Sequence, residues 1–327
     1  MANKERLIWL DVAKGMAIIL MVLGHSGLPY IINSFIFAFH MPFFFIASGL
    51  TTSFSSGVGF GCFFKRKVKG LLVPFFWYSI ILYVLVLINP NVTIDVQQFV
   101  CNGWGDWAIW FVPILFLALI LSELVLSCPK LLRGFLILIL PLSSAVLCYL
   151  HIFLPWKLSV LGFAAFFVIA GHWITDSGLL SKSVQYVKEG GAKTILVFLL
   201  SLGIVFTISH YWRLDMALND VLPIVPKTVS AFAGFVLLSI IAIGVTLPSN
   251  KLFHLIKCVL SKIGRETFMI MALSQIVVVY VNTYYVFNPI VRYLIAIACL
   301  VLCYYLKELI KRINQSVAKT NEDNHKC

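Results

Sequence analysis

Two consecutive apolar segments near the start of the chain contain ionisable side chains. These segments lie within residues 7–50, and the side chains belong to Asp11, Lys14, His25 and His40. A charged group in hydrocarbon costs at least a few kcal/mol, so such residues normally mark a functional site. Backbone in lipid must satisfy its own hydrogen bonds, so segments of this kind fold as helices that pack against one another.

The composition indicates that this pattern extends along the whole chain. Of the 327 residues, 61% are hydrophobic and 12% are charged, whereas a soluble domain has about 25% charged residues. We therefore expect an all-α, polytopic membrane bundle over residues 1–306, followed by a polar tail over 307–327. About ten transmembrane helices are predicted, at residues 8–28, 31–50, 71–89, 109–127, 135–151, 159–175, 194–210, 228–247, 268–286 and 289–306.

The distribution of Lys and Arg predicts the orientation of the bundle. If the N-terminus is cytoplasmic, twenty of the 25 Lys and Arg residues fall in inside segments and four in outside segments, with Lys14 within the first span. This bias predicts that both termini are cytoplasmic. The formal charge of +12 is then explained by topology and by attraction to anionic lipid headgroups, so no nucleic-acid partner is expected.

Known cofactor and metal motifs do not account for the polar residues. The eight cysteines are scattered, mostly in apolar runs, and form no CxxC pair. This spacing favours neither a disulfide framework nor a zinc site. Phosphate-binding loops and the usual hydrolase and zinc-protease motifs are also missing from the sequence. We therefore expect no metal cofactor.

Helical geometry groups the polar residues of the first span. Lys14 and His25 are eleven residues apart, which corresponds to about 20° around the helix and a rise of about 16 Å. Asp11 falls on the same stripe, so a charged pair would lie near the cytoplasmic surface and an imidazole nearer the outer surface. A simple Asp11–Lys14 ion pair at the headgroup boundary is the alternative. Gly15, in the same span, would allow a neighbouring helix to approach closely.

In the second span, Pro42 leaves the carbonyl of Ala38 without its helical donor, next to His40. Most of the phenylalanines in this span are expected to face lipid.

Several segments resemble motifs of one enzyme family. Close resemblance to the acyltransferase-3 family is found in WLDVAKGMAIILMVLGHS (9–26), FAFHMPFFFIASGL (37–50) and FFKRKVKGLLVPFFW (63–77). Residues 107–117 and 263–275 are similar to later motifs of its fucose 4-O-acetylase-like branch. Two positions depart from the family pattern: Ser274 stands where histidine is common, and Gly70 where arginine is common.

The resemblance implies a membrane enzyme with about ten helices in the bacterial inner membrane. Members take an acyl group, usually acetyl, from cytoplasmic acyl-CoA and pass it to a hydroxyl of a cell-envelope or secreted glycan. O-antigen, capsule, exopolysaccharide and a lipid-linked glycan all remain possible acceptors. The family pattern carries over to Lys14, to His25 and to the basic cluster after the second span.

Acyl transfer to a hydroxyl needs a base and donors for the developing oxyanion, which the histidines can supply. We assign His25 as the general base, with a transient acyl-histidine as a variant. His40 is a second candidate for base, orienting group or oxyanion donor, and Asp11 completes the candidate catalytic set.

Binding of the donor needs cations for the CoA phosphates. Arg66, Lys67 and Lys69 suit this role, although a plain positive-inside loop would have the same composition. Lys14 either contacts the pantetheine or pyrophosphate deeper in the bundle or neutralises Asp11. Asp106, at the outer end of the fourth span, is either an acceptor contact or a solvated loop acid.

Two other function classes fit parts of the pattern. A proton-coupled transporter would also have about ten spans and buried ionisable groups, but the polar residues are concentrated in the first seventy positions. A non-catalytic assembly or sensor protein with a degenerate acyltransferase fold is the second alternative. The sequence specifies neither the oligomeric state nor the acceptor.

Overall fold

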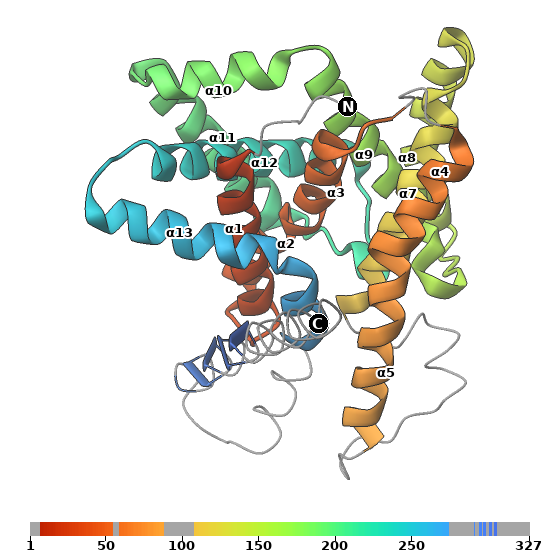
Figure 1. Cartoon of the computed structure of the whole chain (residues 1–327). Helices are drawn as coiled ribbons and strands as arrows, with labels where there is room; N and C mark the ends of the chain where they lie inside the picture. The colour runs from red at the N-terminus through yellow and green to blue at the C-terminus, as the bar shows by residue number, and fades with distance from the viewer. Residues whose placement is uncertain are drawn as a thin grey trace, which may run out of the picture. The chain divides into compact units, whose positions relative to one another are not determined.

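The computed structural model describes residues 7–54, 59–87 and 108–274, together with short stretches between 291 and 305 (Figure 1). The chain divides into two compact units, 1–272 and 273–327, and the following description concerns the first. Its elements are α1 Ile8–Gly24, α2 Tyr30–Phe37, α3 His40–Thr51, α4 Phe60–Lys67, η1 Val68–Leu72, α5 Val73–Leu87, η2 Ala108–Trp110, α7 Phe111–Leu126, α8 Lys130–Tyr149, η3 Pro155–Val160, α9 Leu161–Asp176, α10 Leu179–Glu189, α11 Ala192–Tyr211, η4 Met216–Leu218, α12 Ile224–Thr246 and α13 Lys251–Arg265.

The described elements are helical, which confirms the predicted all-α class. Seven of the helical segments found among the described residues are long and apolar enough to cross a membrane. A chain with this many spans is a multi-pass membrane protein. The total of about ten spans and the cytoplasmic location of both termini stay predictions. The ninth and tenth predicted spans, at 268–286 and 289–306, fall largely outside the described residues.

The second predicted span is one apolar segment but two helices. α2 ends at Phe37 and α3 begins at His40, with Phe39 between them at φ −142°. Pro42 has no N–H to donate to Ala38, so the helix ladder is interrupted there. The next regular bond, from Phe43 N to Phe39 O, is 2.8 Å long. The break therefore places His40 at the first residue of a new helix, as the position of Pro42 had suggested.

The third predicted span begins earlier than the sequence indicated. α4, η1 and α5 form a continuous helix from Phe60, so the boundary predicted at residue 71 was wrong and the basic segment is helical rather than a loop. η1 is a π-helical turn at Val68–Leu72. Pro74 follows this turn and cannot donate to the carbonyl four residues earlier, so a wider turn accommodates it.

Close packing of α1 against α13 depends on two glycines. A Cβ on Gly15 would collide with the backbone carbonyl of Leu260, and one on Gly264 with the carbonyl of Asp11. Only residues without a side chain allow backbones to approach so closely. The predicted role of Gly15 is thereby confirmed, and Figure 1 shows α13 crossing α1. This contact fixes the first helix, which ends at Gly24, directly before His25.

The helices of this unit differ in how deeply they lie in the bundle. In the most apolar part of the segment Ala108–Leu126, 72% of the residues are buried, whereas the corresponding share in α8 is 6%. α7 is therefore a central helix, and α8 presents most of its apolar surface outward, as a lipid-facing helix would.

The aromatic residues of α3 belong to the interior: Phe43 and Phe45 are fully buried. The expectation that most of that aromatic run faces lipid was therefore wrong.

Candidate active site

His25 and His40 meet on the ring of Phe37. His25 is the residue that follows α1, and it is half-buried. Its imidazole contacts Phe37 with a centroid distance of 5.6 Å, and the imidazole of His40 contacts the same ring at 4.8 Å. Phe37 is the last residue of α2, so the helix break described above brings the two histidines to one place.

The tautomer of His40 follows from its hydrogen bond. Nδ1 of His40 lies 3.0 Å from the carbonyl oxygen of Ile36, and the residue is 2% exposed. A carbonyl can only accept, so Nδ1 carries the hydrogen and Nε2 of the neutral ring keeps its lone pair. The ring of His25 forms no hydrogen bond with the residues that the structure describes. Each imidazole therefore has a nitrogen able to accept a proton from a bound molecule.

A small cavity of about 30 Å³ lies against the two imidazoles. This volume exceeds the roughly 10–15 Å³ needed to hold one water molecule. The site can thus admit a hydroxyl group, or a water molecule, beside the histidines. Its described lining consists of Ile18, Met21, His25, Phe37, His40, Met41, Phe44, Ala108, Trp110, Leu214, Asp215, Met216, Ala217 and Met271.

The loop between α11 and α12 adds a charged pair to this site. The guanidinium of Arg213 lies 4.1 Å from the centroid of the Phe37 ring, and its Nη2 is 3.1 Å from Oδ2 of Asp215. Arg213 is close enough to act electrostatically on both imidazoles. Burial raises the pKa of the Asp215 carboxyl, although neighbouring Arg213 opposes this shift. The site therefore combines two neutral imidazoles with a cation and a carboxyl.

The basic segment lies at the far end of α3 from His40. Nζ of Lys67 donates to Oγ1 of Thr52, which follows α3, over 3.0 Å. The twelve residues of α3 correspond to about 18 Å of helix. Arg66 and Lys69 are exposed, whereas Lys67 is half-buried and close enough to Glu123 for their charges to interact. Arg66 and Lys69 are thus available to a ligand, and Lys67 turns toward the protein.

A family model described as an acyltransferase domain, that of the acyltransferase-3 family, matches residues 7–308. The chain belongs to the acyltransferase-3 family. No curated protein and no solved structure matches it. The match includes the histidine site and the basic segment of this acyltransferase. It supports a membrane acyltransferase with an acyl donor and an acceptor.

Asp11 and Lys14 of the acyltransferase lie in the first half of α1, away from the described lining of the histidine cavity. Oδ2 of Asp11 is 3.7 Å from Nε of Arg265 in α13. Because Arg265 is 48% exposed, such a pair contributes less than about 1 kcal/mol. Asp11 thus has a partner that the sequence did not suggest, and Lys14, which is half-buried, lies one turn further along α1.

Sequence reasoning missed Arg213 and Asp215 of the acyltransferase. It counted Arg213 only among the outside cations, because nothing in the spacing of a loop predicts which helix it will contact. Trp110, the last residue of η2, lines the histidine cavity. Asp106 and the tail 307–327 lie outside the described residues, and Ser274 belongs to the second unit. Among the described residues, no group of three His, Cys, Asp or Glu could hold a metal ion.

Proposed function

We propose that this acyltransferase moves an acetyl group from cytoplasmic acetyl-CoA to a hydroxyl of a cell-envelope or secreted glycan, in a bacterial inner membrane. The observation that carries the proposal is the pair of histidines at one cavity, with a free nitrogen on His25 and on His40. Acyl transfer to a hydroxyl requires a group that takes up the hydroxyl proton, and a neutral imidazole has this capacity at pH 7.

His25 acts as the general base. It accepts the proton of the acceptor hydroxyl while the oxygen attacks the thioester carbonyl. The new C–O bond forms, the C–S bond breaks, and the thiolate of CoA leaves with the proton that His25 had accepted. His25 suits this role because its ring is half-buried and has no hydrogen bond among the described residues. His40, held by Ile36, orients the hydroxyl or the water beside it.

The donor binds along α3. The phosphates of CoA contact Arg66 and Lys69, and the flexible pantetheine arm carries the thioester toward the histidine end of the helix. The support for this path is that one helix joins the two regions: it begins at His40, and Thr52 after its end accepts the hydrogen bond of Lys67. Arg66 can bind a phosphate through two parallel hydrogen bonds.

The test is the turnover of purified protein in lipid nanodiscs, with labelled acetyl-CoA and the de-O-acetylated surface polysaccharide of the producing cell. We expect His25→Ala to lower kcat by about 10²–10⁴-fold, the usual effect of removing a general base. Transfer at the wild-type rate by this variant would contradict the assignment.

Two controls keep the result interpretable. His210→Ala removes an exposed histidine at the end of α11, and it should behave as wild type. The thermal midpoint of each variant reports whether the fold is retained.

The same assay tests the alternative of a transporter. A wild-type protein that transports a solute but transfers no acetyl group would favour a carrier over an enzyme.

A further inference from the structure

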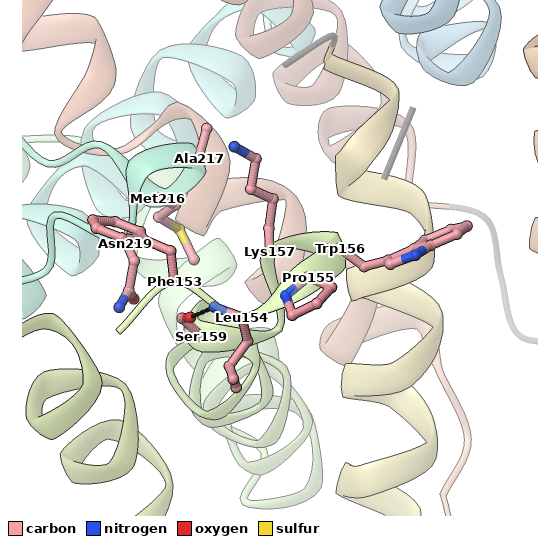
Figure 2. Close-up of a pocket in the computed structure, with 9 residues that line it drawn as sticks. All are labelled: Phe153, Leu154, Pro155, Trp156, Lys157, Ser159, Met216, Ala217 and Asn219. Carbon is pink, nitrogen blue, oxygen red and sulfur yellow. Dashed lines mark hydrogen bonds between the residues drawn. The ribbon is translucent and has the colours of Figure 1, made fainter. Parts of the chain in front are cut away.

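Figure 2 shows the residues that line a second cavity, of about 160 Å³. Its described lining comes from the segment after α8 and from the loop between α11 and α12: Phe153, Leu154, Pro155, Trp156, Lys157, Ser159, Met216, Ala217 and Asn219. A cavity of about 150 Å³ is known to hold one benzene molecule. This one therefore has room for about one six-membered ring, such as the ring of a pyranose.

The two cavities share part of their walls. Met216 and Ala217 line both the 160 Å³ cavity and the small cavity at His25 and His40. Met216 belongs to the short helix η4, and a methionine side chain adapts its shape readily. A sugar ring bound in the larger cavity would therefore be separated from the imidazoles by the side chains of Met216 and Ala217.

The shared wall is held in place by an unusually well-connected loop. The backbones of Asp215 and Asp220 exchange two hydrogen bonds, of 3.3 and 2.9 Å. Nζ of Lys227, a residue that is only 2% exposed, donates to Oδ1 of Asp220 at 2.6 Å and to its carbonyl at 3.0 Å. Because these contacts fix both ends of the loop, the backbone of Met216 and Ala217 is preorganised, while the Met216 side chain can still adjust to a ligand.

The opposite wall contains strained backbone. Trp156 and Lys157 have φ values of 59° and 58°, a left-handed conformation that costs about 1–2 kcal/mol for each residue other than glycine. Ser159 stabilises the turn, since its Oγ accepts from Leu154 N at 2.7 Å (Figure 2). The indole of Trp156 points away from the other drawn side chains, toward Phe75. Strain of this kind is concentrated at binding sites, and here it directs Lys157 to the cavity.

We propose that the cavity between η3 and η4 binds the acceptor sugar, and that Lys157 selects a sugar bearing an acidic group. Of the described lining residues, Lys157 is the only ionisable one. Asn219 and Ser159 add polar atoms, and Phe153, which is 68% exposed at the rim, offers an aromatic face to a sugar ring. The inference rests on the proposed function, because it assigns the acceptor subsite of that reaction.

The experiment measures KM for both substrates, with full-length protein in nanodiscs and labelled acetyl-CoA. The acceptor is the de-O-acetylated surface polysaccharide of the producing cell, offered intact, carboxyl-reduced and dephosphorylated. We expect Lys157→Gln to raise the KM for the intact polysaccharide about tenfold, the usual effect of losing a charge-assisted hydrogen bond, with the KM for acetyl-CoA unchanged. Lys157→Arg should restore the wild-type value.

The chemical treatments identify the acidic group. Carboxyl reduction raises the wild-type KM if the group is a carboxylate, and dephosphorylation raises it if the group is a phosphate. Neither treatment should raise the KM of Lys157→Gln further.

A second variant, Ala217→Leu, makes the cavity smaller at the shared wall. It should also raise the KM for the acceptor and leave the KM for acetyl-CoA unchanged. Lys182→Gln, an exposed charge on α10, is the matched control.

Three negative results have different meanings. If the wild type transfers acetyl but Lys157→Gln and Ala217→Leu keep its KM for the acceptor, the cavity is not the acceptor site. If the wild type responds to neither carboxyl reduction nor dephosphorylation, the selection for an acidic sugar is refuted. If the wild type transfers nothing to any of the three polysaccharides, the proposed function itself fails.

Discussion

The histidine site and the basic segment differ in how much of their geometry is fixed by packing. His40 is 2% exposed and hydrogen-bonded to Ile36, and both imidazoles contact Phe37. Arg66 and Lys69, by contrast, are exposed on the surface of a helix. Bond making requires reacting groups held in a narrow range of positions, whereas long cationic side chains can follow a mobile phosphate. The difference suggests that chemistry belongs to the first region and donor capture to the second.

The largest expected effect concerns the two histidines as a unit. His40→Ala should lower kcat by about 10²-fold, the lower end of the range for groups that act on the transferred proton. The double variant with His25→Ala should lose no more than His25→Ala alone, because groups that act together are strongly non-additive. The measurement is kcat for all three variants at saturating acetyl-CoA. Losses that multiply would show that the histidines act independently.

The next effect tests whether the Arg213–Asp215 pair belongs to the packed region. Arg213→Gln should destabilise the protein by about 1–3 kcal/mol, because a buried carboxylate would lose its charged partner. The double variant with Asp215→Asn should recover part of this loss. Denaturant or thermal unfolding of the four proteins provides the measurement. Equal unfolding free energies for wild type and Arg213→Gln would mean that the pair contributes nothing to stability.

Changes in the basic segment should affect binding rather than turnover. Arg66→Gln and Lys69→Gln together should raise the KM for acetyl-CoA by about tenfold with kcat nearly unchanged. The same KM should rise with salt, because exposed charges are screened. Lys65→Gln, on the same helix, is the control. A change in the KM for the acceptor of equal size would argue against phosphate binding at these residues.

The smallest effect is a pH dependence. The pKa of Asp215 is raised by burial, so the folded protein binds this proton more readily than the unfolded chain. The resulting stabilisation is fully present below the ordinary pKa of a carboxyl group and is lost as pH rises through the raised value. Asp215→Asn should lack this loss of thermal stability. Identical pH profiles of the two thermal midpoints would contradict the prediction.

Features that depend on local sequence were predictable. The long apolar runs gave the described helices to within a few residues for most spans. Pro42 indicated the backbone break next to His40, and Gly15 indicated a close helix contact. Each follows from the chemistry of one residue and its immediate neighbours: a missing N–H, a missing side chain, or a continuous apolar segment.

Features that depend on tertiary contacts were not predictable. Asp11 pairs with Arg265, a residue near the other end of the described chain. Arg213 reaches the site because its loop folds back onto Phe37, and loop composition does not encode that path. The inward turn of Lys67 depends on Thr52 and Glu123, which belong to other parts of the chain.

The shared contact of both imidazoles with Phe37 has a consequence for the fate of the thioester. The rings are not hydrogen-bonded to each other in the part of the chain that the structure describes, so a proton passing between them needs a carrier. The cavity beside them has room for about one water molecule. Whichever hydroxyl fills that position attacks the thioester. Under the proposed function, a water molecule that takes the place of the sugar hydroxyl would hydrolyse the acetyl donor slowly.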